Sequence, residues 1–157
     1  MKNTEQAFLW IIEILERMNI SYKISGGFAA RTYGVRRELA DIDIEVNDKN
    51  ITLISDEVKQ YITYGPARYM DNNWDLNLMT LQYQGQEIDI AGVEAKIFNK
   101  ENGDWEKTGS GLDNYELIEV YGKKVPIEKL DILITYKTKL SREVDVEDVK
   151  QLKLLKK

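Results

Sequence analysis

The sequence contains no cysteine and no histidine. Without cysteine, the chain cannot form disulfides, bind zinc through thiolates or use a cysteine nucleophile. Without histidine, it lacks the commonest general base of enzymes and the commonest protein ligand of transition metals. Any catalysis would therefore depend on carboxylates, lysine, tyrosine, serine or threonine, together with metals that prefer oxygen ligands.

A long apolar segment and an excess of basic residues are also missing. No apolar run approaches the length of a membrane-spanning helix, and residues 1–5 lack the basic and apolar regions of a secretory signal. We therefore expect a cytoplasmic protein that does not enter membranes. The net charge of −5 argues against a nucleic-acid-binding surface, which is normally basic, and suits a cationic small substrate or a basic partner protein better.

The remaining composition is that of an ordinary globular protein, with 43% hydrophobic and 31% charged residues. A chain of 157 residues predicts one domain, spanning residues 1–157, with a sizeable core. Helical and strand patterns both occur along the chain. Residues 91–114 follow neither pattern and are rich in turn residues, so we expect a mobile or functional loop there.

A glycine pair, Gly26-Gly27, follows Ser25 at the end of a short predicted strand and precedes a short predicted helix. Because glycine has no Cβ and the following amides point outward, a turn of this kind can approach a phosphate group closely. The same dipeptide could also be an ordinary turn. By itself it is therefore only a weak indication of a phosphate site.

Residues 41–46, Asp-Ile-Asp-Ile-Glu-Val, alternate acidic and aliphatic side chains. As a strand, this segment places Asp41, Asp43 and Glu45 on one face and the aliphatic residues on the other. Neighbouring carboxylates repel each other unless a cation lies between them, and Mg²⁺ prefers oxygen ligands together with substrate phosphates. The glycine turn followed by this strand predicts a nucleotide site; the alternative is an edge strand whose acids are simply solvated.

These motifs resemble the signature of the DNA polymerase β-like nucleotidyltransferase superfamily, in which a glycine pair precedes two acids on a strand and a third acid on a later strand. Asp89, in Gln86-Glu87-Ile88-Asp89-Ile90, matches the third acid. The resemblance implies an α+β (α/β) nucleotidyltransferase fold, with a mixed β-sheet flanked by helices and with C-terminal helices. It also implies a nucleoside triphosphate, such as ATP, over the glycine turn.

The same resemblance assigns roles to the acids. Asp41 and Asp43 would bind Mg²⁺ or Mn²⁺, and Asp89 would be the third ligand, the general base, or both. Glu45 is the reserve candidate for these roles.

The C-terminal part carries a second resemblance, to the end of small bacterial and archaeal nucleotidyltransferases of the lincosamide, aminoglycoside and abortive-infection types. Pro126, Lys137 and Arg142, followed by Asp145 and Asp148, make up this pattern. The resemblance implies that Lys137 reaches the nucleotide phosphates. The pattern itself suits Asp145 as a helix N-cap and Asp148 as a residue near the helix terminus.

Arginine follows the glycines at three positions, Arg31, Arg36 and Arg37. Each is either a solvated charge or a contact to the triphosphate or the acids. We take Arg31 as a candidate nucleotide-binding residue beside those already named, which are Ser25, Gly26, Gly27 and Lys137.

The function implied by the resemblance is transfer of a nucleoside monophosphate to an acceptor hydroxyl. A small acceptor, such as an aminoglycoside or a lincosamide, fits the acidic balance and the segments around Trp74 and Trp105. Two alternatives are a defence enzyme that modifies a partner protein or RNA, and a nucleotide-binding module without turnover. The small size also leaves room for a homodimer in which a second subunit completes the acceptor site.

Overall fold

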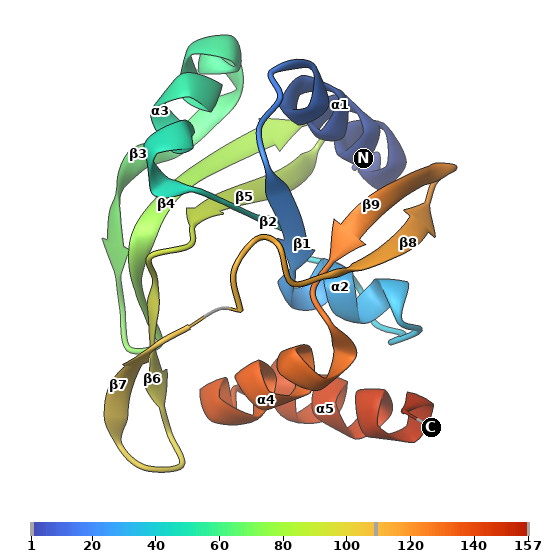
Figure 1. The fold of residues 1–157 in the computed structure, drawn as a ribbon, viewed down its shortest axis with the longest axis vertical. Helices are drawn as coiled ribbons and strands as arrows, with labels where there is room; N and C mark the ends of the chain where they lie inside the picture. Colours follow the sequence, from blue (N-terminus) through green and yellow to red (C-terminus); the bar gives the residue numbers. More distant parts are fainter. Residues whose placement is uncertain (1, 109, 157) are drawn as a thin grey trace.

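The computed structural model describes residues 2–108 and 110–156, which form a nine-stranded sheet and five α-helices (Figure 1). The strands are β1 (Tyr22–Ser25), β2 (Asp41–Val46), β3 (Ile62–Met70), β4 (Trp74–Tyr83), β5 (Gln86–Gly92), β6 (Lys96–Asn99), β7 (Asp104–Lys107), β8 (Glu116–Val120) and β9 (Lys123–Ile127). The helices are α1 (Thr4–Arg17), α2 (Gly26–Thr32), α3 (Asp48–Glu57), α4 (Leu130–Leu140) and α5 (Glu143–Leu155), with a short 3-10 turn, η1 (Lys59–Tyr61).

The sheet is mixed, as predicted. Its strand order is β7-β6-β4-β5-β2-β1-β9-β8, and β3 pairs with β4 outside this path. Strand β2 lies between β5, to which it is parallel, and β1, to which it is antiparallel. Figure 1 shows α4 and α5 side by side at one end of the molecule, whereas α1 and α3 lie at the opposite end. The two acidic strands, β2 and β5, are therefore neighbours at the centre of the sheet.

The alternation in β2 divides the strand between the core and a cavity. Ile42, Ile44 and Val46 are fully or almost fully buried. They belong to the same apolar cluster as Phe8 of α1 and Ile54 of α3. Burial of each of these aliphatic side chains stabilises the fold by roughly 2 kcal/mol. This determines the register of β2, because a shift by one residue would place its acids in the core instead.

The prediction of a patternless loop over residues 91–114 is wrong for its central part. Strand β5 continues to Gly92, and residues 96–99 and 104–107 form the β6–β7 hairpin. Phe98 and Trp105 face each other across this hairpin with their ring centroids 5.6 Å apart. Both strands have four residues, too few for a period-two pattern to stand out in the sequence.

Strand β3 was not predicted, because Gly65-Pro66 interrupts its pattern. It lies at an edge, and within the described part of the chain it pairs with β4 alone, with register shifts on either side of Tyr64. An edge strand tolerates proline because one side of it needs no hydrogen-bond donor. The assignment of Asp145 as an N-cap is also wrong, because Arg142 occupies the cap of α5 and Asp145 is the third residue of the helix.

No helix among the described residues is both long enough and apolar enough to cross a membrane.

Candidate active site

The glycine pair forms the first two residues of α2, directly after β1, and lies against an acid of β2. Gly26 has φ +60°, and a Cβ at this position would lie 2.8 Å from Cγ of Asp43 and closer still to its Oδ2. A Cβ on Gly27 would lie 2.8 Å from Nη2 of Arg37. The missing side chains therefore let the turn approach one carboxylate and one guanidinium group.

We expect Gly26→Ala to destabilise the protein more than Gly103→Ala. Both glycines have positive φ, at +60° and +78°, so both substitutions carry about 1–2 kcal/mol of backbone strain. Only Gly26 also faces Asp43, whereas the Cβ of an alanine at Gly103 would meet nothing within 4 Å. Urea unfolding of the two variants measures the difference, which we expect to be at least about 1 kcal/mol. Equal losses would show that Gly26 is required only for its φ.

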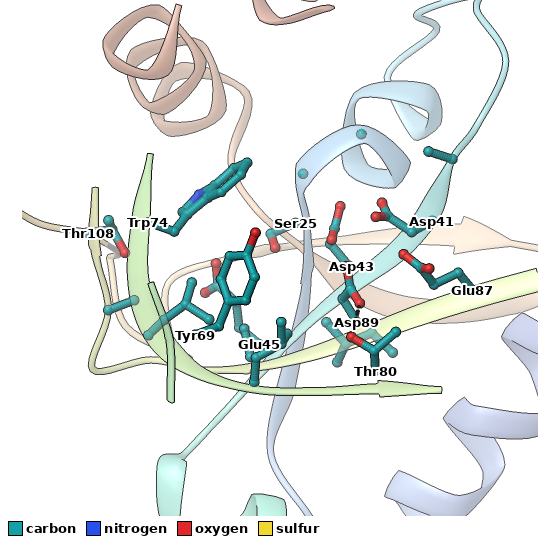
Figure 2. Close-up of a pocket in the computed structure, with 18 of the residues that line it drawn as sticks. Ser25, Asp41, Asp43, Glu45, Tyr69, Trp74, Thr80, Glu87, Asp89 and Thr108 are labelled. Atoms are coloured by element: carbon teal, nitrogen blue, oxygen red, sulfur yellow. Dashed lines mark hydrogen bonds between the residues drawn. The ribbon is translucent and has the colours of Figure 1, made fainter. Parts of the chain in front are cut away.

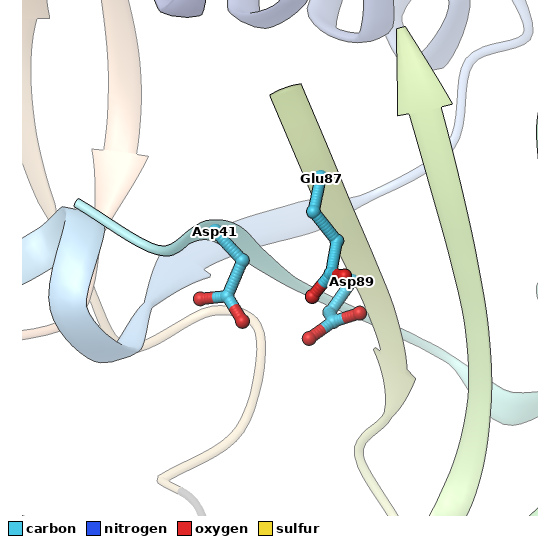
Figure 3. Close-up of side chains that lie close together, drawn as sticks. All are labelled: Asp41, Glu87 and Asp89. Carbon is cyan, nitrogen blue, oxygen red and sulfur yellow. The ribbon is translucent and has the colours of Figure 1, made fainter. Parts of the chain in front are cut away.

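The parallel pairing of β2 with β5 brings four carboxylates together. Asp41 pairs in register with Glu87, and Asp43 pairs with Asp89. Carboxylate oxygens of Asp41, Glu87 and Asp89 lie within 4.8 Å of one another, and Figure 3 shows these three groups converging. Asp43 lies beside this group and its charge interacts with those of Asp41 and Asp89. The adjacency implied for Asp41, Asp43 and Asp89 is present, and Glu87 joins it.

Crowding of these acids disfavours their ionised forms. Burial, followed by the charges of Asp41 and Asp89, raises the pKa of Asp43 well above its ordinary value. Burial and then Asp41 raise the pKa of Asp89 to about 7, against a hydrogen bond from Thr80 that lowers it. The pKa of Glu87 is raised for the same first two reasons. The charge of Lys137 lowers the pKa of Asp43 but does not outweigh burial and the other acids, so the cluster suits a divalent cation.

One oxygen of Asp89 is already oriented. The Thr80 hydroxyl, on β4, donates a hydrogen bond of 2.7 Å to Oδ1 of Asp89. Strand β4 pairs with β5 so that these two residues lie in register. The second oxygen of Asp89 points toward the other acids of the cluster (Figures 2 and 3).

Cationic side chains from α4, α5 and the loop after α2 form another part of the cavity wall. The ammonium group of Lys137, which is 1% exposed, lies 2.9 Å from Oδ2 of Asp148 and 3.4 Å from Oδ1 of Asp145. Arg37 donates two hydrogen bonds to Asp148, at 2.7 and 2.9 Å. Arg142 donates two to Asp145, at 2.6 and 3.0 Å. The two aspartates thus hold three cations in place at the cavity.

The acids and cations line one cavity of about 660 Å³, a volume typical of small-molecule sites. Of the candidate nucleotide-binding residues, Ser25, Gly26, Gly27 and Lys137 line it. Arg31 does not, because it lies on the exposed side of α2. Figure 2 shows the cluster of carboxylates at one end of the cavity and Trp74, Tyr69 and Thr108 at the other.

The sequence reasoning missed three functional candidates. Glu87 stands two residues before Asp89, so the period-two rule that selected Asp43 from Asp41 would also have selected it. Arg37 is one of the three arginines that follow the glycines, and its sequence position gives no reason to prefer it over Arg31. Arg142 appeared only as part of a pattern, and nothing local in the sequence indicates that either arginine reaches the cavity.

Comparison with known proteins assigns the fold through solved structures and not through sequence. No protein-family model matches the sequence, and no curated protein sequence matches it.

Solved structures do match. TM1012 from Thermotoga maritima, a protein provisionally assigned as a nucleotidyltransferase, superposes with a TM-score of 0.70 at 19% identity, covering 99% of this chain and 97% of that one. The lincosamide antibiotic adenylyltransferase LnuA, with lincomycin bound, gives 0.64 at 18% identity, covering 99% and 100%. ANT(2")-Ia, in complex with adenylyl-2"-tobramycin, gives 0.61 at 13% identity, covering 97% and 94%. The chain therefore has the fold of the nucleotidyltransferases.

Proposed function

We propose that the protein is a metal-dependent nucleotidyltransferase, which moves a nucleoside monophosphate from ATP or another nucleoside triphosphate to a hydroxyl group of a small acceptor. The observation that carries the proposal is the convergence of Asp41, Glu87 and Asp89 within 4.8 Å, in a cavity that also holds the Gly26-Gly27 turn. The shared fold with adenylyltransferases that act on antibiotics adds support.

The donor set fits Mg²⁺ or Mn²⁺. The converging Asp41, Glu87 and Asp89, with Asp43 beside them, offer only carboxylate oxygens, the ligand type that Mg²⁺ prefers. Burial first, and then the charges of neighbouring acids, raise the pKa of Asp43 and of Asp89, so a cation beside them would offset the cost of ionising these carboxyls. A bound divalent cation would neutralise the triphosphate and polarise the α-phosphate.

Side chains of the protein would carry out the proton transfer and bind the triphosphate. Asp89 takes the proton of the acceptor hydroxyl, because it is one of the converging carboxylates and the Thr80 hydroxyl fixes the orientation of its side chain. The acceptor oxygen then forms a bond to the α-phosphorus, the bond to the bridging oxygen of the β-phosphate breaks, and pyrophosphate leaves. Lys137, Arg37 and Arg142 provide positive potential along the cavity wall for the triphosphate.

A small acceptor fits the geometry better than a macromolecule. The cavity has room for one nucleotide and one compact partner, at about 660 Å³. Two structures with this fold carry an antibiotic or its adenylylated form, lincomycin in LnuA and adenylyl-tobramycin in ANT(2")-Ia. We therefore propose that the acceptor is a small alcohol that carries an amino group. The assay below includes both lincosamides and aminoglycosides.

The test is pyrophosphate release by the purified protein. The protein is incubated with Mg²⁺ and each of the common nucleoside triphosphates in turn, with and without lincosamides and aminoglycosides, and with EDTA in place of Mg²⁺ as a control. We expect release that requires both the metal and one class of acceptor. Label that moves from the triphosphate to protein or RNA in a cell extract would instead favour a defence enzyme. A protein that neither binds nor hydrolyses any triphosphate would overturn the proposal.

A further inference from the structure

Five charged side chains meet at one wall of the cavity, and we call them the charge network. They alternate in sign, in the order Arg37, Asp148, Lys137, Asp145 and Arg142. Each aspartate is fully buried, lies against Lys137 and also accepts two hydrogen bonds from one arginine. With three positive and two negative side chains, the network has a net charge of +1.

Lys137 is enclosed by this network. Its side chain is 1% exposed, and its ammonium group lies 2.9 Å from Asp148 and 3.4 Å from Asp145. If the ammonium group moved away to reach a ligand, two buried carboxylates would lose the cation that they share, which costs several kcal/mol. The charge of Lys137 still acts on the cavity, because it lowers the pKa of Asp43. Lys137 can therefore add to the potential of the cavity without contacting a ligand.

The two arginines are more accessible. The side chain of Arg37 is 25% exposed and that of Arg142 is 34% exposed. Both bind their aspartate through Nε and Nη2. Nη1 of Arg37 donates a hydrogen bond of 3.1 Å to the carbonyl of Glu38, and among the described residues Nη1 of Arg142 has no acceptor. Since a guanidinium group carries five N–H donors, each arginine keeps donors for a ligand.

Both guanidinium groups are also fixed in position. Paired hydrogen bonds to an aspartate hold the plane of each group, and that of Arg142 lies 4.6 Å from the centre of the Trp74 ring. Nη2 of Arg37 lies 2.8 Å from the place that a Cβ on Gly27 would take, and the charge of Asp41 acts on Arg37. Arg37 is therefore close to both the glycine turn and the acidic strand β2.

We propose that Arg37 and Arg142 bind the phosphate groups of the triphosphate, and that Lys137 is a positioning residue that does not contact them. The inference rests on the proposed function and narrows it by assigning the anion contacts. It differs from the role that the sequence resemblance implies for Lys137. Because Lys137 neutralises Asp145 and Asp148 from the inner side, the arginines can bind these aspartates and still offer N–H groups and positive charge to a phosphate.

Binding of an anion tests this without turnover. Calorimetry measures the affinity of the protein for two probes, inorganic tripolyphosphate and ATP, each premixed with Mg²⁺. Arg37→Gln should weaken the binding of both at least about tenfold, because it removes charge-assisted hydrogen bonds. The matched control is Arg31→Gln, on the exposed side of α2 and outside the cavity, which should bind both probes like the wild type.

Two further variants distinguish a positioning lysine from a phosphate-binding one. Lys137→Met removes the positive excess of the network, so the arginines are fully engaged by the aspartates, and affinity for both probes should fall at least about tenfold. Lys137→Met combined with Asp145→Asn removes one charge of each sign, restores the net charge and keeps the pairing of Arg37 with Asp148. The double variant should bind both probes within about threefold of the wild type. All affinities are measured below the unfolding temperature of the variant.

The proposal is wrong if the double variant binds tripolyphosphate at least about tenfold more weakly than the wild type, because neutralising an aspartate cannot replace a lysine that contacts phosphate. This comparison decides the question even if Lys137→Met alone does not fold. Wild-type affinity in folded Lys137→Met, or in Arg37→Gln, would also overturn the proposal.

Failure of this inference and failure of the proposed function are separable. Binding that follows these expectations, without pyrophosphate release in the presence of any acceptor, would contradict the transferase activity alone. Pyrophosphate release by the wild type, together with a double variant that does not recover its affinity, would contradict the positioning role of Lys137 alone.

Discussion

Asp41→Asn should reduce pyrophosphate release by about 10³-fold, the largest effect expected of any single substitution in this chain. Asp41 belongs to the converging group with Glu87 and Asp89, and its charge also raises the pKa of Asp43. Loss of this one charge therefore weakens the whole cation site. Replacement by asparagine keeps the size of the side chain, so the cavity should keep its shape.

Stability should move in the opposite direction. In metal-free buffer, Asp41→Asn removes repulsion within the cluster, so its melting temperature should equal or exceed that of the wild type. Pyrophosphate release and thermal unfolding in EDTA, measured on the same preparations, separate a lost site from a lost fold. The control is Asp56→Asn on α3, whose exposed carboxylate lies 3.9 Å from Lys59 and should affect neither measurement. A fully active Asp41→Asn would contradict the proposed metal site.

The second large effect is on stability and comes from the buried charges between α4 and α5. Lys137→Met should lower the free energy of unfolding by about 3 kcal/mol. Lys137 is 1% exposed and forms ion pairs with Asp145 and Asp148, which are both fully buried. Methionine fills the space but carries no charge. The two buried aspartates would then be neutralised only by Arg37 and Arg142, whose side chains are partly exposed. Urea unfolding at neutral pH measures the loss.

A second variant of the same buried charge cluster, Asp148→Asn, should lose stability in a way that depends on pH. Burial by itself would raise the pKa of Asp148, but hydrogen bonding from Arg37 and the charge of Lys137 outweigh it, and the pKa is lowered. A carboxyl with a lowered folded-state pKa stabilises the protein above its unfolded-state pKa of about 4, and this contribution is lost as the pH falls through the folded-state value. The deficit of Asp148→Asn relative to the wild type should therefore be full at neutral pH and shrink below about pH 4.

Asp131→Asn is the matched control for these variants. Its exposed carboxylate pairs at 2.6 Å with Lys156 and joins the same two helices from the outside. Exposed ion pairs contribute little to the free energy of unfolding, because water screens them. This variant should therefore unfold like the wild type both at neutral pH and below about pH 4. A comparable loss in Asp131→Asn would mean that helix contact in general, and not the buried charge, is responsible.

Much of the site could be predicted from local patterns. The alternation in residues 41–46 determined that Asp41 and Asp43 share a face and that Ile42 and Ile44 are core, because successive side chains of a strand point to opposite sides. The glycine pair indicated a close approach of backbone, and Gly26 indeed has φ +60° against Asp43. The same rule, applied fully, would have added Glu87 to Asp89.

Only the tertiary structure decided which distant groups meet. Arg37, and not Arg31, faces the cavity because the chain after α2 turns back toward α5, where Asp148 holds it at 2.7 Å. Trp74 lines the cavity, whereas Trp105 packs against Phe98 in the β6–β7 hairpin, away from it. The sequence by itself determined the faces of strands and the sites of turns, since covalent geometry acts over a few residues. The neighbours of those faces were decided by sheet order and helix packing, which depend on contacts between segments far apart in the chain.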